Sequence, residues 1–409
     1  MSAALLILLG GIVAIGFLGD LFFERTRIPD TLPLISIGIL LGPVLRIVPP
    51  EAARPYMGPF GAIALTIILF EGGLDLDLRS AVRQAGRAAV LAVASFALSA
   101  FLVYYALAVG TGAGGWRTLA AAAALACTSA PIVIPVARKL LPDSPARPLL
   151  AVEAALSDAL AVMTVLALLK AEGGEVAGAS LIGALGASFA ASVAVGLVAG
   201  ILWLWLLGLL YSRRYFYVMT IGFVFLLMGG IEAFHGSGPL AVLAFGIVLA
   251  NGDAILGLFG ARAQDRLRKL FADGRVELRP EIGKSHAEIS FLIRSFFFVY
   301  LGIIFRWPGA DMSLWLAIIL AVLAVLCGRQ GAVALTSWTT RIPPAERPVL
   351  AAMLPRGLAT AVLAAMLSEG APAGSPSWET IAAFVVLASN IWMTLRLAKL
   401  RRTGGAGAA

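Results

Sequence analysis

Apolar runs long enough to cross a membrane recur along this chain, from its first residues to about residue 400. A helix that spans the hydrocarbon core needs roughly 20 consecutive apolar residues. Of the 409 residues, 60% are hydrophobic and 13% are charged, whereas an average soluble protein has roughly 25% charged residues. A soluble fold could not bury so much apolar surface. The sequence therefore predicts an all-α polytopic membrane protein and excludes a water-soluble enzyme.

Charge clusters and Gly/Pro turns divide the chain into thirteen predicted spans. Their boundaries are 4–23, 31–48, 59–75, 84–110, 117–137, 148–169, 178–210, 215–234, 238–251, 285–305, 313–338, 347–368 and 379–398. We expect one transmembrane domain over 1–402 and a disordered Gly/Ala tail at 403–409. The long connection at 252–284 is either a solvated linker or, over 257–271, an amphipathic helix on the membrane surface.

The connections alternate in charge: one set carries 23 basic residues and the other only 5. The positive-inside rule then places the N-terminus outside and the C-terminus in the cytoplasm of a plasma-membrane protein. The net charge of +8 does not indicate nucleic acid, because the basic residues lie in short turns between spans. Cys127 and Cys327 both fall inside apolar runs, which favours packing roles over a disulfide.

Six ionisable side chains fall well inside the predicted spans. They are Glu71, Glu153, Asp158, Arg294, Arg329 and Arg356. A charge in hydrocarbon is costly unless it is paired or hydrated, so each of these side chains is a candidate for function. Glu153 and Asp158 share the sixth span but are five residues apart, about 140° around a helix, and so point to different faces. One can pair with an arginine while the other faces a cavity.

Two spans are interrupted near their middle, within Ala126–Pro135 in the fifth and within Met353–Thr360 in the twelfth. Proline removes a backbone donor and glycine permits unusual dihedral angles, so both helices are predicted to unwind there. Unwound stretches can coordinate ions near the membrane midplane. With spans 1–6 and 8–13 as two halves joined by span 7, each break falls in the fifth helix of its half. That placement predicts an inverted repeat.

With these features the chain resembles the monovalent cation/proton antiporters, specifically their NhaP-type, sodium/proton-exchanger-like group. The resemblance covers essentially the whole chain. It rests on Phe70-Glu71-Gly72-Gly73-Leu74, Glu153 with Ser157-Asp158, Arg329 within Cys-Gly-Arg-Gln-Gly, and Pro355-Arg356-Gly357-Leu358.

The resemblance implies a role for each matching position. Asp158 would bind either the cation, Na⁺ or K⁺, or the proton, and Glu153 would pair with Arg329 to fix the core. Arg356 would lie at the second helix break. The remaining residues that would line the ion site are Glu71, Thr128, Ser129 and Ser157.

The resemblance also implies a homodimer and an elevator movement. Each protomer would have a scaffold formed by about 1–80 and 211–308, and a mobile core formed by about 81–170 and 309–400. The helix at about 178–210 would link them. The implied partners are a monovalent cation, the proton and the lipid bilayer, with no cofactor and no nucleic acid.

The cation is the least determined part of this interpretation. Relatives carry Asn-Asp or Asp-Asp where this chain has Ser157-Asp158, and many read Thr-Asp-Pro where it has Ser129-Ala130-Pro131. Sodium or lithium exchange is favoured, with potassium/proton antiport and an ion-coupled organic-solute transporter as alternatives. Because Ser157 does not ionise and an arginine at 329 stays protonated, Asp158 is the one obvious cycling group. We therefore expect electroneutral 1:1 exchange, unless Glu71 also titrates.

Overall fold

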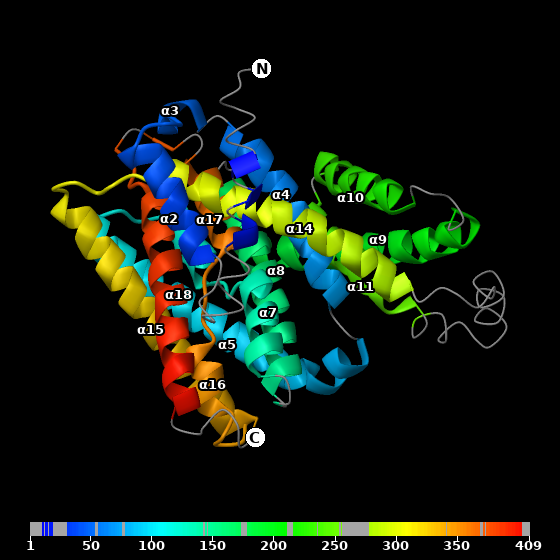
Figure 1. Ribbon diagram of the computed structural model, residues 1–409. Coiled ribbons are helices and arrows are strands. Elements are labelled where there is room, and N and C mark those ends of the chain that lie inside the picture. The colour runs from blue at the N-terminus through cyan, green and yellow to red at the C-terminus, as the bar shows by residue number, and fades with distance from the viewer. Residues whose placement is uncertain are drawn as a thin grey trace. The chain divides into compact units, whose positions relative to one another are not determined.

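The computed structural model describes residues 10–18 without 12 and 15, 31–53, 56–75, 78–141, 144, 146–172, 178–210, 216–234, 236–252, 255, 278–340, 342–368, 371–372 and 374–402. Within these ranges every regular element is a helix (Figure 1). The tail at 403–409 and most of the connection at 252–284 lie outside the described residues, so both of those predictions stay open.

The helices follow the predicted spans. They are α2 (Thr31–Ile39), η1 (Leu40–Val44), α3 (Pro50–Ala53), α4 (Met57–Asp75), α5 (Leu78–Thr111), α6 (Trp116–Ala126), α7 (Ala130–Leu140), α8 (Ala146–Glu172), α9 (Gly178–Leu210), α10 (Phe216–Ala233), α11 (Gly238–Ala250), α14 (Leu278–Ile303), α15 (Met312–Thr339), α16 (Arg347–Ala352), α17 (Leu358–Ser368) and α18 (Trp378–Arg402). Spans 2 to 13 each correspond to one helix or to a pair. The predicted all-α fold, with its two broken helices, is confirmed.

Several boundaries differ from the prediction. α5 begins at Leu78 and α14 at Leu278, each at least six residues earlier than expected, because arginine and lysine are good helix formers and a helix does not have to end where the hydrocarbon ends. The second span is also irregular. Its last turn is the π-helical segment η1, which contains Pro43; proline lacks the N–H that an α-helical turn would need there.

The chain forms two compact units. The first comprises Met1–Ala62, Gln84–Ala177 and Leu292–Ala409, and the second comprises Ile63–Arg83 and Gly178–Phe291. The first unit holds both broken helices, α6–α7 and α16–α17, together with α8, α15 and α18, which pack on them. In the second unit α11 packs along α9 and α10 (Figure 1).

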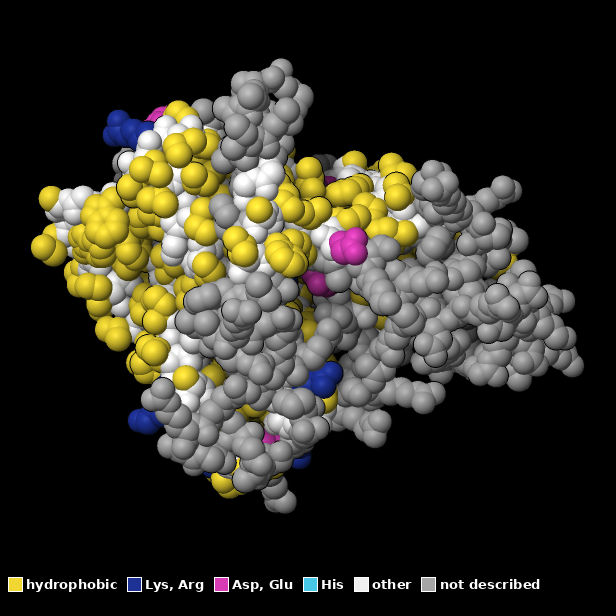
Figure 2. Space-filling model, in the orientation of Figure 1, with side chains coloured by type: hydrophobic (Ala, Val, Ile, Leu, Met, Phe, Trp, Pro, Cys, Tyr) yellow, Lys and Arg dark blue, Asp and Glu magenta, His cyan; other side chains and the backbone are white. Residues whose placement is uncertain are grey.

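The described surface is rich in apolar side chains (Figure 2). On α15, Leu316, Ile319 and Leu323 are exposed at helical spacing, and Phe101 and Tyr105 are exposed in the same manner on α5. Large contiguous apolar surface is unusual on a soluble monomer. Five of the described helices are long and apolar enough to cross a membrane, and six further apolar helices are shorter. Both observations support a multi-pass membrane protein.

Small residues allow two helices of the first unit to touch at their backbones. A Cβ on Gly302 of α14 would lie 2.7 Å from the Cα of Gly38 on α2 and would overlap the carbonyl oxygen of Ile35. Close contacts of this type are a common way to pack membrane helices, because lipid supplies no hydrophobic driving force between them.

We expect Gly302→Val to lower the free energy of unfolding by about 2 kcal/mol, as overpacking in a filled interior does. Thermal unfolding of the purified protein in detergent measures the effect. Gly222→Val on α10 is the matched control, because among the described residues no atom beyond its own stretch of helix lies within 4 Å of a Cβ at that position. Equal unfolding temperatures for the two variants would contradict this account of the packing.

Candidate functional site: a buried crossing of two broken helices

The first helix break is the extended stretch Cys127–Ser129 between α6 and α7. A break leaves backbone N–H groups without helical partners, and hydrocarbon offers no replacement. Side chains of α8 satisfy two of them. The Thr128 N–H donates to Ser157 Oγ (3.0 Å), and the Ala130 N–H donates to Asp158 Oδ2 (3.1 Å). The two adjacent polar residues of α8 therefore hold the first break open.

The second break, Met353–Gly357 between α16 and α17, crosses the first. The Ser129 N–H donates to the Pro355 carbonyl over 2.9 Å. A Cβ on Gly357 would overlap Ser129 Oγ and would lie 3.0 Å from Ile132 Cδ1. The close approach of the two stretches therefore requires glycine at position 357, for lack of room rather than for an unusual backbone angle.

Asp158 lies at this crossing with only 3% of its surface exposed. Its Oδ2 accepts the bond from Ala130, but its Oδ1 has no hydrogen-bond partner in the described structure. The hydroxyl of Ser129, 1% exposed, is likewise unpartnered there. A buried carboxylate oxygen without a partner is unfavourable. The arrangement therefore favours binding of a proton or a cation at Oδ1.

Arg356 is fully buried in the second break. Its Nη1 donates to Thr128 Oγ1 (3.1 Å), so its side chain reaches the first break. Its backbone is held by α18: the Arg356 N–H donates to Ser389 Oγ (3.0 Å), and Asn390 Nδ2 donates to the Arg356 carbonyl (2.8 Å). Within the described residues the guanidinium nitrogens Nε and Nη2 have no hydrogen-bond partner.

Glu153 and Arg329 form a buried ion pair beside the crossing. Both side chains are 0% exposed, and Arg329 Nη1 lies 2.8 Å from Glu153 Oε1. Arg329 also donates to Ser95 Oγ on α5 (3.2 Å) and to the Leu350 carbonyl near the end of α16 (2.9 Å). One arginine of α15 therefore connects α5, α8 and the first half of the broken helix α16–α17.

Glu71 is placed in the second compact unit, in α4. There it accepts a short hydrogen bond from the Ser290 hydroxyl of α14. The other predicted site residues all belong to the first unit. A contribution of Glu71 to the cation site therefore stays a prediction.

Several polar residues at the crossing escaped the sequence interpretation. Cys127 is buried with its Sγ 3.3 Å from the Thr360 hydroxyl, and Ser95, Ser389 and Asn390 bond the two buried arginines. The available signal was a polar residue in the middle of an apolar span, as in Leu-Ala-Ser-Asn-Ile of the thirteenth. Serine and asparagine carry no charge, so a search for ionisable residues passes over them.

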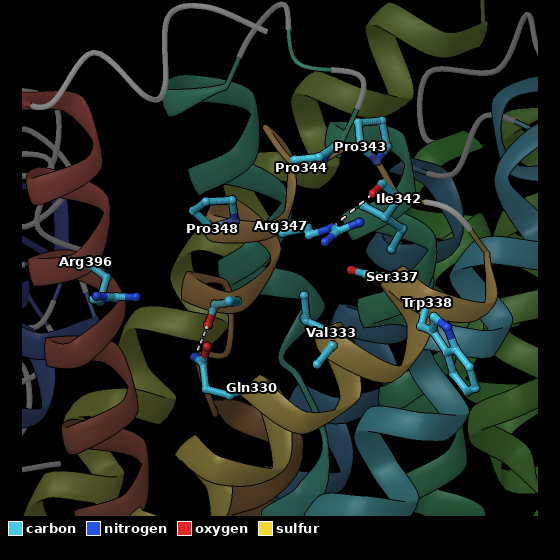
Figure 3. Close-up of a pocket in the computed structure, with 12 residues that line it drawn as sticks. Gln330, Val333, Ser337, Trp338, Ile342, Pro343, Pro344, Arg347, Pro348 and Arg396 are labelled. Atoms are coloured by element: carbon cyan, nitrogen blue, oxygen red, sulfur yellow. Dashed lines mark hydrogen bonds between the residues drawn. The ribbon is translucent and has the colours of Figure 1, made fainter.

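A cavity of about 740 Å³ in the first unit lies apart from the crossing, around the turn between α15 and α16. Its polar lining includes Arg347 and Arg396. Arg347 turns back to donate to the Ile342 carbonyl, while Arg396 stands on α18, on the other side of α16 (Figure 3). The two guanidinium groups do not converge on one point, and Asp158 does not line this cavity.

Helices that break and cross over a buried carboxylate define a class: ion-coupled secondary transporters, whose substrate sites are formed by discontinuous helices. Residues 10–398 match the transmembrane sodium/hydrogen exchanger family, and the chain belongs to that family. It is therefore a membrane transporter rather than an enzyme, and its class of activity is cation/proton antiport.

The fold agrees with solved antiporter structures. The sodium proton antiporter MjNhaP1 from Methanocaldococcus jannaschii at pH 8 is similar over 98% of both chains, with a TM-score of 0.76 and 21% identity. An electron-microscopy structure of MjNhaP1 matches over 99% of this chain and 98% of the other, with a TM-score of 0.71 and 20% identity. A search of curated protein sequences found no significant match.

We expect Glu153→Gln to destabilise the protein by about 3–5 kcal/mol, because it leaves the Arg329 charge buried and unpaired. The matched control is Glu172→Gln, which breaks the partly exposed Arg117–Glu172 pair (2.9 Å) at an expected cost below about 1 kcal/mol. Thermal unfolding in detergent compares the variants. The double variant Glu153→Leu/Arg329→Met should recover part of the loss, since it removes both charges. A Glu153→Gln variant as stable as the control would contradict the anchoring role.

Proposed function

We propose that this protein exchanges Na⁺ for H⁺ across the plasma membrane and that Asp158 is the group for which the two ions compete. The observation that carries the proposal is the unpartnered Oδ1 of Asp158 at the crossing of two broken helices. Membership in the sodium/hydrogen exchanger family supports the choice of sodium. MjNhaP1, which has the same fold, is described as a sodium proton antiporter.

The mechanism rests on the cost of a bare buried carboxylate. A proton neutralises Asp158, and so does a bound monovalent cation, whereas the empty ionised form is unfavourable in a dry interior. We assume that the site around Asp158 switches its access from one side of the membrane to the other only in these two loaded states. Inward movement of one ion then requires outward movement of the other. Competition at one carboxylate thereby gives exchange rather than leak.

The hydroxyl groups around Asp158 are not equivalent as ligands. Ser157 Oγ already accepts the Thr128 N–H, and Thr128 Oγ1 already accepts from Arg356. Ser129 Oγ has no partner among the described residues. We therefore assign Ser129, with Asp158 Oδ1, the most direct contact with the cation. Thr128 and Ser157 fix the shape of the site, and Glu71 is proposed as a further acidic ligand.

The stoichiometry follows from which groups can release a proton. Glu153 is held by Arg329 over 2.8 Å, and an arginine stays protonated in proteins. Asp158, whose Oδ1 has no partner among the described residues, is then the proposed carrier of the proton. Its protonated and its cation-bound forms carry the same charge. Exchange of one proton for one cation would move no net charge.

The remaining parts of the proposal concern the assembly and its movement. We propose a homodimer in which a core containing the crossing moves relative to a scaffold, with the N-terminus outside and the C-terminus in the cytoplasm. Support comes from the 23-to-5 distribution of basic residues and from the family. The scaffold at about 1–80 and 211–308 and the core at about 81–170 and 309–400 stay predictions.

Potassium/proton antiport is the second candidate. The chain has Ser129-Ala130-Pro131 in and beside its first break, so the Thr-Asp pair of many relatives is replaced by a serine, which lacks the threonine methyl group, and by an apolar residue. An organic substrate is less well supported. Membership in the sodium/hydrogen exchanger family favours an inorganic cation over an organic solute.

We expect purified protein in proteoliposomes to dissipate an imposed pH gradient when Na⁺ is added and Asp158→Asn to abolish this response. The asparagine keeps the shape of the side chain but can neither bind a proton nor carry the charge that attracts a cation. Asp311→Asn is the matched control, because Asp311 is an exposed cap of α15 and asparagine is an equally good cap. Its rate should match that of the unaltered protein.

The same vesicles decide the choice of ion. A response to K⁺ but not to Na⁺ would replace the proposed cation and leave the mechanism intact. Absence of a response to Na⁺, Li⁺ and K⁺, in protein shown to be folded, would overturn the proposed function.

We expect the initial rate of Na⁺-driven proton movement to be the same with and without clamping of the membrane potential by K⁺ and valinomycin. An exchange of one charge for one charge generates no potential that could oppose it. A rate that rises at least two-fold under clamping would show net charge movement. That result would indicate a second titrating group, for which Glu71 is the first candidate.

A further inference from the structure

The helix that follows each broken helix carries two adjacent polar residues at the break. In the first half this helix is α8, with Ser157 and Asp158; in the second half it is α18, with Ser389 and Asn390. All four side chains are at most 3% exposed. Buried polar residues are rare in an apolar span and usually have a specific partner.

The two pairs make corresponding hydrogen bonds. Each serine oxygen accepts a backbone N–H of its break: Ser157 Oγ from Thr128 and Ser389 Oγ from Arg356, both over 3.0 Å. The residue that follows each serine binds the backbone of the same break through one of its two terminal atoms.

Asp158 and Asn390 each have a second terminal side-chain atom that makes no hydrogen bond to a described residue. Asp158 Oδ1 and Asn390 Oδ1 are both buried and without a hydrogen-bond partner among the described residues. The fold is an inverted repeat in which α8 and α18 occupy equivalent positions. The two serines make the same bond at these equivalent positions. The residues after them bind the break in opposite senses, since Asp158 accepts a backbone N–H and Asn390 donates to a backbone carbonyl.

The two pairs differ in charge. Asp158 can ionise, whereas the amide of Asn390 cannot. In the second half a positive charge is supplied by the protein itself, because Arg356 lies between the Asn390 pair and the first break, with Nη1 3.1 Å from Thr128 Oγ1. The second half thus has a fixed cation and a neutral amide where the first half has an exchangeable cation and a carboxylate.

We propose that Ser389 and Asn390 are the second-repeat counterpart of the Ser157–Asp158 pair and that they position Arg356 across the cation site. Through Arg356 they set the place of Thr128 and hence the geometry of the first break. They are positioning residues and do not touch the transported ion. This inference rests on the proposed function, since it assigns a role within the same site.

Asn390→Ala removes the donor that holds the Arg356 carbonyl. We expect it to raise the apparent KM for Na⁺ at least ten-fold in the proteoliposome assay, because the site loses its shape while Asp158 is retained. Ser389→Ala removes the acceptor for the Arg356 N–H and should act in the same direction. Thr394→Ala on α18 is the matched control, because the hydroxyl of Thr394 donates to the Asn390 carbonyl one turn away, within the same helix. It should change the KM by less than two-fold.

Asn390→Asp tests the positioning role through the pH profile of exchange, which a merely structural role would leave unchanged. A protonated carboxyl group can still donate to the Arg356 carbonyl, but an ionised one cannot. The titratable and charged groups near Arg356 are Cys127, Glu153, Asp158 and Arg329, and the substitution replaces none of them. We expect Asn390→Asp to retain exchange at acidic pH and to lose at least ten-fold at the alkaline end of the wild-type profile.

The outcomes separate the two proposals. No exchange by the unaltered protein would overturn the proposed function. Exchange by the unaltered protein, with an unchanged KM in Asn390→Ala and a wild-type pH profile in Asn390→Asp, would overturn the positioning role alone. If Asn390→Ala does not elute as folded protein in detergent, Ser389→Ala and the pH profile of Asn390→Asp decide the question.

Discussion

The hydrogen bond from the Ser129 N–H to the Pro355 carbonyl joins two helix breaks, and the site depends on this crossing. Backbone groups freed from a helix inside a membrane must find partners within the protein. The bond between Ser129 and Pro355 supplies one such partner to each break. Further partners come from α8, through Ser157 and Asp158, and from α18, through Asn390. The residues that bind the broken backbone therefore include Asp158, the residue at which ion exchange is proposed.

The buried charges divide into an anchor and a working site. Glu153 and Arg329 neutralise each other over 2.8 Å. Arg329 also donates hydrogen bonds to Ser95 on α5 and to the Leu350 carbonyl on α16. Such a pair is weak evidence for stability, but losing one partner is costly. Among the described residues Asp158 Oδ1 has no hydrogen-bond partner, and in the proposed function this oxygen binds the proton and the cation in turn. The separation of these roles is possible because Glu153 and Asp158 face different sides of α8.

The sequence predicts some features of this structure and not others. The presence of breaks within Ala126–Pro135 and within Met353–Thr360 was predictable, because proline and glycine act on the local backbone. The early start of α14 at Leu278 and the π-helical turn around Pro43 were not, because helix ends carry only weak local signals. Asn390 was missed since its importance comes from its position opposite Arg356, which is 34 residues away along the chain.

The sequence by itself determined the membrane environment, the helices, the two breaks and the short list of buried charges. Each of these follows from hydrophobicity, backbone chemistry or the cost of a charge in hydrocarbon, all of which are local properties. The Glu153–Arg329 pair was an expectation from the family resemblance, and the structure places the two side chains 2.8 Å apart. Only the tertiary structure decided that Ser129 meets Pro355 and that Asp158 Oδ1 has no partner among the described residues. These are contacts between distant parts of the chain, and they depend on how the helices pack rather than on which residues are apolar.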